Sequence, residues 1–88
     1  MNKYIDPFLA NVPSLDVHGY DSSGAVAEIK IFIDNYYGRL NEKKLIIVHG
    51  KGEGILRKAT HNYLKSDKRV LSFKTNYGND GETIVIMR

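Results

Sequence analysis

The chain has 88 residues, of which 42% are hydrophobic and 26% charged, as is usual for one small folded domain. It has no cysteine, which excludes disulfides and thiolate metal sites and fits a reducing, cytoplasmic compartment. No apolar run reaches the roughly 18 residues that a membrane-spanning helix needs, so we expect no membrane association.

The charge is unevenly distributed along the chain. The net charge is +3, yet the segment from Lys43 to Lys74 holds nine basic and two acidic residues, a net +7, and the rest carries −4. This asymmetry favours a surface that faces a polyanion. A solvated, lysine-rich exterior is the alternative.

The N-terminal residues predict an arm followed by a domain. Residues 1–13 contain Pro7 and Pro13 and show no periodicity, so we expect an extended arm ahead of a domain at 14–88. These two prolines also interrupt the continuous apolar stretch that a signal peptide would need at the N-terminus. The domain begins with a predicted short strand at Ser14–His18.

A helix is predicted next, ending at about Arg39. Asp21, Ser22 or Ser23 can cap its first turn, and Gly38 is a suitable stop. Apolar residues recur there at three- and four-residue steps and form one stripe that consists of Ala25, Val26, Ile29, Phe32, Ile33 and Tyr36.

A buried strand and a second helix follow. Leu45–Val48 is continuously apolar, which predicts a strand buried on both faces inside a sheet. Gly50, Gly52 and Gly54 then interrupt the chain before a helix at about Ile55–Lys65. Its inward positions are expected to be Ile55, Leu56, Ala59, Tyr63 and Leu64.

The C-terminal part predicts two antiparallel strands. These are Val70–Asn76 and Thr83–Met87, joined by the turn-forming sequence NYGNDG. The whole order is β-α-β-α-β-β. It predicts an α/β two-layer sandwich in which two helices lie mainly on one face of a mixed four-stranded sheet.

The tripeptide Val-His-Gly occurs twice, ending at Gly19 and at Gly50, each time between a predicted strand and a helix. If the two strands are parallel, His18 and His49 emerge at the same edge of the sheet, where α/β proteins bind ligands.

The second copy opens a glycine-rich loop that suits a phosphate. Alternate glycines let backbone N–H groups approach an anion, the next helix adds a positive N-terminus, and Lys51, Arg57 and Lys58 add charge. The spacing matches neither a P-loop nor the dinucleotide-binding fingerprint. A tight turn that needs glycine for steric reasons is the alternative.

The first copy supplies Asp16 and His18, which share a face if the strand is regular. A carboxylate that fixes the tautomer of an imidazole suits proton transfer, and such a pair can cleave RNA without a metal. The alternative is structural, with Asp16 bonded to backbone amides and His18 capping the turn. His61 is expected on the surface, Tyr20 and Tyr77 could stack on a base, and no metal-ligand spacing is present.

These motifs carry a family resemblance. The sequences LDVHG, IIVHGKGEGILR and VLSF…GETIVIM, in this order over residues 14–88, resemble a Smr (small MutS-related) domain. The first family signature falls on Leu15, Asp16, His18 and Gly19. The second falls on His49, Gly50, Lys51 and Gly52, followed by Gly54, Leu56 and Arg57. Val17 replaces a more common leucine, and the arm resembles the leader of stand-alone bacterial members.

The resemblance implies a fold similar to the C-terminal domain of a bacterial translation initiation factor, and nucleic-acid binding. In many members it implies endonuclease activity on DNA or RNA, and some relatives act on messenger RNA at stalled ribosomes. It ties Asp16 and His18 to cleavage and the glycine loop to substrate binding. The resemblance does not extend to a MutS-like ATPase, a coiled coil or a ubiquitin-binding module within these 88 residues. We therefore expect that functions that depend on those modules do not transfer.

Three hypotheses result. The first is a monomeric endonuclease, in which Asp16 and His18 are catalytic, His49, Gly50, Lys51, Gly52, Gly54 and Arg57 bind substrate, and Mg²⁺ or Mn²⁺ is an optional cofactor. The second is a non-catalytic nucleic-acid-binding or ribosome-binding module. The third is a binder of small phosphate ligands or a regulatory protein-interaction domain.

Overall fold

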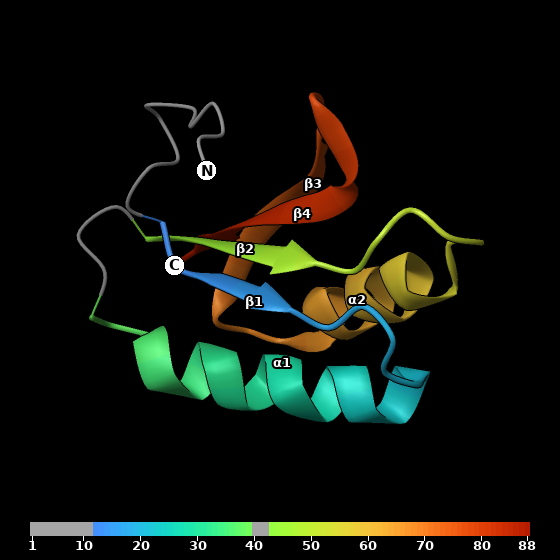
Figure 1. The fold of residues 1–88 in the computed structure, drawn as a ribbon. Helices are drawn as coiled ribbons and strands as arrows, with labels where there is room; N and C mark the ends of the chain where they lie inside the picture. Colours follow the sequence, from blue (N-terminus) through green and yellow to red (C-terminus); the bar gives the residue numbers. More distant parts are fainter. Residues whose placement is uncertain (1–11, 40–42) are drawn as a thin grey trace.

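The computed structural model describes residues 12–39 and 43–88 (Figure 1). The expected element order is confirmed, and the elements are β1 (Ser14–Asp16), α1 (Ser22–Tyr36), β2 (Lys44–Val48), α2 (Ile55–Ser66), β3 (Val70–Asn76) and β4 (Asn79–Met87). Of the predicted N-terminal arm at 1–13, only Val12 and Pro13 lie within the described residues, and the division at residue 13 stays a prediction.

The strands form one mixed sheet in the order β1-β2-β4-β3. β1 runs parallel to β2, with Asp16 opposite Val48, while β4 is antiparallel to both β2 and β3. The pairing continues past the end of β1, because the Val17 N–H donates to the Val48 carbonyl at 2.8 Å. In Figure 1 the arrows of β1 and β2 point the same way, so both strands end at one edge of the sheet.

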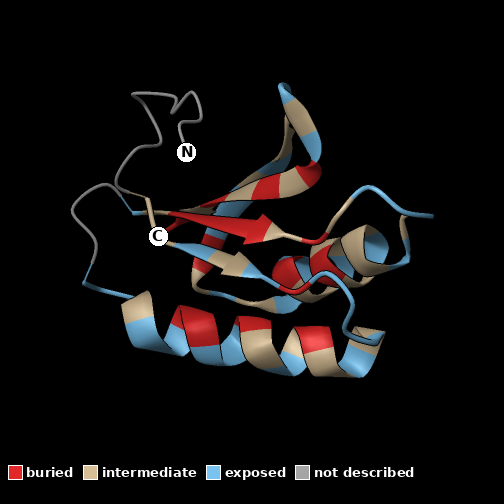
Figure 2. Ribbon diagram, viewed as in Figure 1, coloured by how far each residue is buried: buried red, intermediate tan, exposed pale blue. Residues whose placement is uncertain are grey.

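The core lies between the sheet and the two helices, which cover the same face (Figure 2). β2 is buried on both faces, as expected, since Leu45, Ile46 and Ile47 are all buried. Leu45 and Ile47 join the core cluster, and Ile46 faces the opposite side. The other members of the core are Val17, Ala25, Ile29, Phe32, Ile33, Leu64, Val70, Val85 and Met87.

The first helix ends three residues before the predicted Arg39. Asp21 caps its start by accepting from the Gly24 N–H at 2.8 Å. At the other end Gly38 takes a left-handed φ of +79°, which stops the helix at Tyr36. Within the described parts of the chain, neither helix is long and apolar enough to cross a membrane.

Two further predictions needed correction. The last strand begins at Asn79 instead of Thr83. The turn of the hairpin consists of Tyr77 and Gly78 alone, and Asn79 already pairs with Asn76 of β3. Ile55 was expected to face inward but is 62% exposed. It is the first residue of α2, and its exposed side chain lines two surface grooves.

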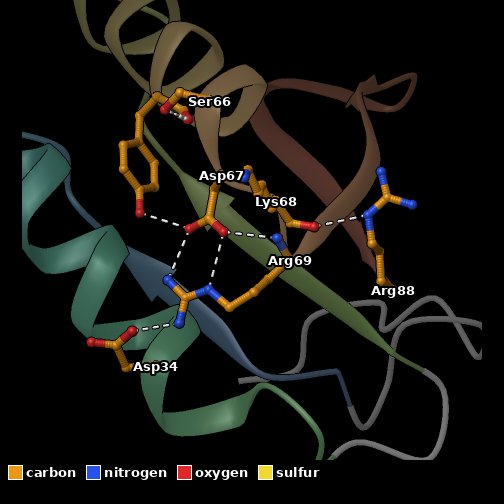
Figure 3. A network of polar contacts seen from close by, with 7 residues as sticks. Asp34, Ser66, Asp67, Lys68, Arg69 and Arg88 are labelled. Carbon is orange, nitrogen blue, oxygen red and sulfur yellow. Dashed lines mark hydrogen bonds and ion pairs between the residues drawn. The ribbon is translucent and has the colours of Figure 1, made fainter.

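A polar network joins α1 to the turn before β3 (Figure 3). Arg69 donates to both carboxylate oxygens of Asp67, at 3.0 and 2.9 Å, and pairs with Asp34 on α1. The Tyr63 hydroxyl donates to Asp67 at 2.7 Å. These bonds, chiefly those from Arg69, hold the pKa of Asp67 well below its ordinary range.

Candidate nucleic-acid site

The two Val-His-Gly sequences form two similar turns that touch. Gly19 and Gly50 both have a φ of +85°, the left-handed conformation that favours glycine. A side-chain carbon placed on Gly50 would lie 3.5 Å from Cβ of His18. The prediction that the two motifs meet at one sheet edge is therefore confirmed.

Asp16 and His18 are paired through a turn and do not share a strand face. β1 ends at Asp16, two residues earlier than predicted, because the Asp16 carboxylate accepts the His18 backbone N–H at 3.0 Å. This bond bends the chain out of the ladder. The same Oδ1 lies 2.6 Å from Nδ1 of His18, so the predicted contact is present although its geometry was wrong.

The pairing fixes how His18 presents its ring. A carboxylate only accepts, so Nδ1 carries the proton, and in the neutral ring Nε2 is a free acceptor. The side-chain and backbone hydrogen bonds from His18 lower the pKa of Asp16. The His18 side chain is 71% exposed, so Nε2 is available to a ligand.

The glycine-rich loop is attached to the start of β4. The backbone N–H groups of His49 and Gly50 both donate to the Gly81 carbonyl, at 2.9 and 3.0 Å. A side-chain carbon on Gly81 would lie 3.2 Å from the Gly50 carbonyl carbon, closer than ordinary contact. Gly81 therefore allows the loop to lie directly on the strand.

The loop glycines have different structural requirements. Gly50 and Gly54 need left-handed φ angles of +85° and +83°. Gly52 has no left-handed φ, and within residues 12–39 and 43–88 no atom beyond its chain neighbours lies within 4 Å of the place where its side chain would start. The fold itself thus explains Gly50 and Gly54 but not Gly52.

Positive charge and free N–H groups surround the loop. Gly54 is the N-cap of α2 and supplies no side-chain cap, which leaves N–H groups of the first turn without a capping side chain. The Arg57 guanidinium lies over Gly54, with Nη2 3.0 Å from the position of a Cβ on that glycine. Lys51 is exposed and lies 3.8 Å from the Asp80 carboxylate.

A groove of about 320 Å³ runs between the two turns, and both motifs line it. Its lining residues are His18, Gly19, His49, Gly50, Gly52, Glu53, Gly54, Ile55, Leu56 and Arg57. A second groove of about 430 Å³ shares Arg57 with the first and continues along α2, where Lys58, His61, Asn62 and Lys65 line it. Glu53 contributes one negative charge to both grooves.

Two residues of the site region escaped sequence reasoning. His61 is half-buried instead of superficial, and its Nε2 lies 2.7 Å from the hydroxyl of Thr83. The same hydroxyl lies 2.8 Å from Nε2 of His49, whose side chain is almost wholly buried. The helical spacing of Arg57 and His61 could have placed them on one face, but only the sheet register brings Thr83 to them.

Of the remaining sequence candidates, Tyr20 is 48% exposed and Tyr77 is 99% exposed. Among residues 12–39 and 43–88, no three histidine, aspartate or glutamate side chains are grouped closely enough to hold a metal ion.

Known proteins resemble this chain along most of its length. The Smr domain family model matches residues 15–88. The chain is 41% identical to a protein named Endonuclease MutS2 from Acetivibrio thermocellus, over 84% of this chain and 10% of that protein. A MutS2 endonuclease from Caldicellulosiruptor bescii is 38% identical over 78% of this chain and 9% of its own length.

The fold matches as well. The crystal structure of the Smr domain of Thermus thermophilus MutS2 superimposes with a TM-score of 0.81 at 34% identity, covering 88% of this chain and 99% of that domain. The chain thus spans about a tenth of the curated relatives and nearly all of the isolated domain. On the family match and on this structural agreement, the chain belongs to the Smr domain family.

Proposed function

We propose that this Smr domain binds nucleic acid in the groove between the two turns and cleaves its phosphodiester backbone. The observation that supports the proposal is the contact between the two turns, because an oriented histidine lies beside a glycine-rich loop that would suit an anion. The relatives named as endonucleases support the reaction class.

In this proposal Asp16 and His18 are the catalytic pair. Asp16 holds Nδ1 of the ring, and the exposed Nε2 of His18 takes the proton from the attacking oxygen. In RNA that oxygen is the 2′-hydroxyl, and in DNA it is a water molecule. The attack forms the new P–O bond and breaks the bond to the leaving oxygen, which takes a proton from a water molecule in the open groove. The hydroxide that results then recovers the proton held by His18. Asp16 stabilises the imidazolium that forms on His18.

The glycine loop binds the phosphate in this proposal. N–H groups of the loop and of the first turn of α2 supply neutral donors. Arg57 in the groove lining and the exposed Lys51 beside the groove supply charge. The groove along α2 gives the neighbouring nucleotides a positive path past Lys58 and Lys65. His49 lines the same groove but keeps both ring nitrogens on protein partners, so its contact with substrate stays a prediction.

A cleavage assay tests the reaction. End-labelled single-stranded RNA and duplex DNA are incubated with wild type, His18→Ala and His18→Gln at micromolar protein, with EDTA, Mg²⁺ or Mn²⁺. The wild type should cut one of the substrates, and both variants should lose at least about a hundredfold in rate, since general-base catalysis is worth 10² to 10⁴. Equal cutting by wild type and His18→Ala would refute the catalytic role.

A binding module without catalysis is the second candidate. The observation that favours it is exposure, because the Asp16 and His18 side chains are 53% and 71% exposed and water screens charges there. Binding without cleavage would then be the result. Lys51→Ala should weaken binding for all sequences and flatten the salt slope by about one unit. Absent or salt-independent binding would rule out both candidates.

A further inference from the structure

Three side chains behind the glycine loop share one hydroxyl. Thr83 of β4 is fully buried, and its Oγ1 lies 2.8 Å from Nε2 of His49 and 2.7 Å from Nε2 of His61. The His61 ring is packed between α2 and the sheet, with its centroid 4.9 Å from that of Phe73. Three separate elements therefore meet at one oxygen atom.

The positions of the protons in this cluster can be deduced from one carbonyl group. Nδ1 of His49 lies 3.1 Å from the Gly50 carbonyl, which only accepts, so Nδ1 carries the proton. The neutral ring then has a bare Nε2, and the Thr83 hydroxyl must donate to it. The Thr83 oxygen is left to accept the Nε2 proton of His61.

We propose that His61 and Thr83 are positioning residues that fix the ring of His49 and, through it, the Gly50 carbonyl of the phosphate-binding loop. The bonds run in one direction, from His61 through Thr83 and His49 to Gly50. The opposite tautomer of His49 would bring a lone pair against the Gly50 carbonyl and lose that bond. The link to substrate rests on the proposed function, whereas the proton arrangement does not.

The direction of the bonds also withstands protonation of His61. Burial lowers the pKa of His61, and so do nearby positive charges: that of His49 whenever its ring is protonated, and those of Arg57 and Lys65. Among the described residues no partner bonds to its Nδ1, and the His61 ring lines the groove along α2. A proton added from that groove goes to Nδ1 and leaves the bond from Nε2 to Thr83 in place.

Nitrogen-15 NMR of the imidazole rings tests the arrangement without any nucleic acid. The wild type should show His49 with its proton on Nδ1 and His61 with its proton on Nε2. The His49 Nδ1 proton should exchange slowly with water in wild type and in Thr83→Ser, and at least about tenfold faster in Thr83→Val, which keeps the shape but not the hydroxyl. A His49 proton on Nε2 in the wild type would overturn the proposal.

Matched substitutions at His61 test the functional link. His61→Gln keeps a donor, and His61→Phe keeps an aromatic ring without one. Melting curves verify that all variants are folded. For a labelled single-stranded oligonucleotide, Thr83→Val should bind about three- to tenfold more weakly than Thr83→Ser, and His61→Phe should bind more weakly than His61→Gln by a similar factor.

The outcomes separate this inference from the proposed function. If the wild type binds no oligonucleotide, the proposed function fails, while the NMR result still decides the arrangement of protons. If Thr83→Val changes neither proton exchange nor affinity, the positioning role is refuted even though the wild type binds.

Discussion

Substitution of Gly52 by alanine separates the two explanations for a glycine-rich loop. If the glycine serves only the turn, the added methyl group should affect the fold; if it serves a ligand, the methyl group should affect binding. Gly52 has no left-handed φ, and in the described part of the chain no atom beyond its two chain neighbours lies within 4 Å of the new carbon. The folded structure can therefore accommodate alanine at position 52 without a steric clash.

The expected effects on stability and binding have opposite signs. Alanine at a permissive position stabilises by about 0.4–1 kcal/mol, because it restricts the unfolded chain. For a domain of this size that corresponds to a melting temperature raised by about 2–8 °C. The same methyl group occupies the groove where a phosphate would approach the backbone, so affinity for an oligonucleotide should fall about tenfold, an overpacking cost of roughly 1–2 kcal/mol.

Thermal melting and fluorescence anisotropy with a labelled single-stranded RNA measure both effects on the same sample. Gly50→Ala is the matched control for the effect on stability. Because Gly50 has a φ of +85°, alanine there should lower the free energy of unfolding by about 1–2 kcal/mol. A Gly52→Ala variant that binds like wild type would refute the reasoning, and so would one that melts at a lower temperature.

Three further predictions concern the surroundings of the site. Gly81→Ala should lose about 1–3 kcal/mol of unfolding free energy, because the new carbon meets the Gly50 backbone; Gly78→Ala, in open space on the same hairpin, should be close to neutral in urea melts. Asp80→Asn should tighten oligonucleotide binding about two- to threefold at low salt, because it releases Lys51 from its ion pair. The effect should disappear at high salt and be absent in the control Glu28→Gln. Equal affinities of Asp80→Asn and wild type at low salt would contradict this prediction. Asp67→Asn should lose about 2–3 kcal/mol at neutral pH, measured by denaturant melts. The pKa of Asp67 is lower in the folded state than in the unfolded state, so its carboxylate contributes fully to the free energy of unfolding above about pH 4 and loses this contribution as the pH falls through the folded pKa. The stability difference between Asp67→Asn and wild type should therefore narrow in acid. A difference that stays constant with pH would contradict the account.

Much of the fold could be predicted from periodicity alone. The continuous apolar run of β2 and the stripe on α1 predict their own burial, because each pattern has the period of its element. The residues at which helices and strands end were harder to predict from the sequence. Gly38 stopped α1 earlier than expected, and the Asp16 carboxylate ended β1 by bonding the His18 amide, which depends on side-chain geometry more than on pattern.

The candidate site was partly visible in the sequence. The repeated Val-His-Gly motif predicts two strand ends at one edge, since parallel strands that follow helical crossovers end on the same side. The cluster around Thr83 was not visible. His61 lies on a different element from His49, and only the antiparallel register that sets Thr83 opposite Ile47 brings the three together.

The central claim is that the Asp16–His18 turn and the glycine loop form one site for one nucleic-acid chain. Backbone amide NMR during titration with a short single-stranded oligonucleotide tests it most directly, with the amides of Gly19, Gly50 and Gly52 as reporters. The account predicts that all three shift together with a single dissociation constant, while amides at the C-terminal end of α1, such as Tyr36, stay in place. Shifts confined to Gly50 and Gly52, or a separate dissociation constant at Gly19, would contradict it.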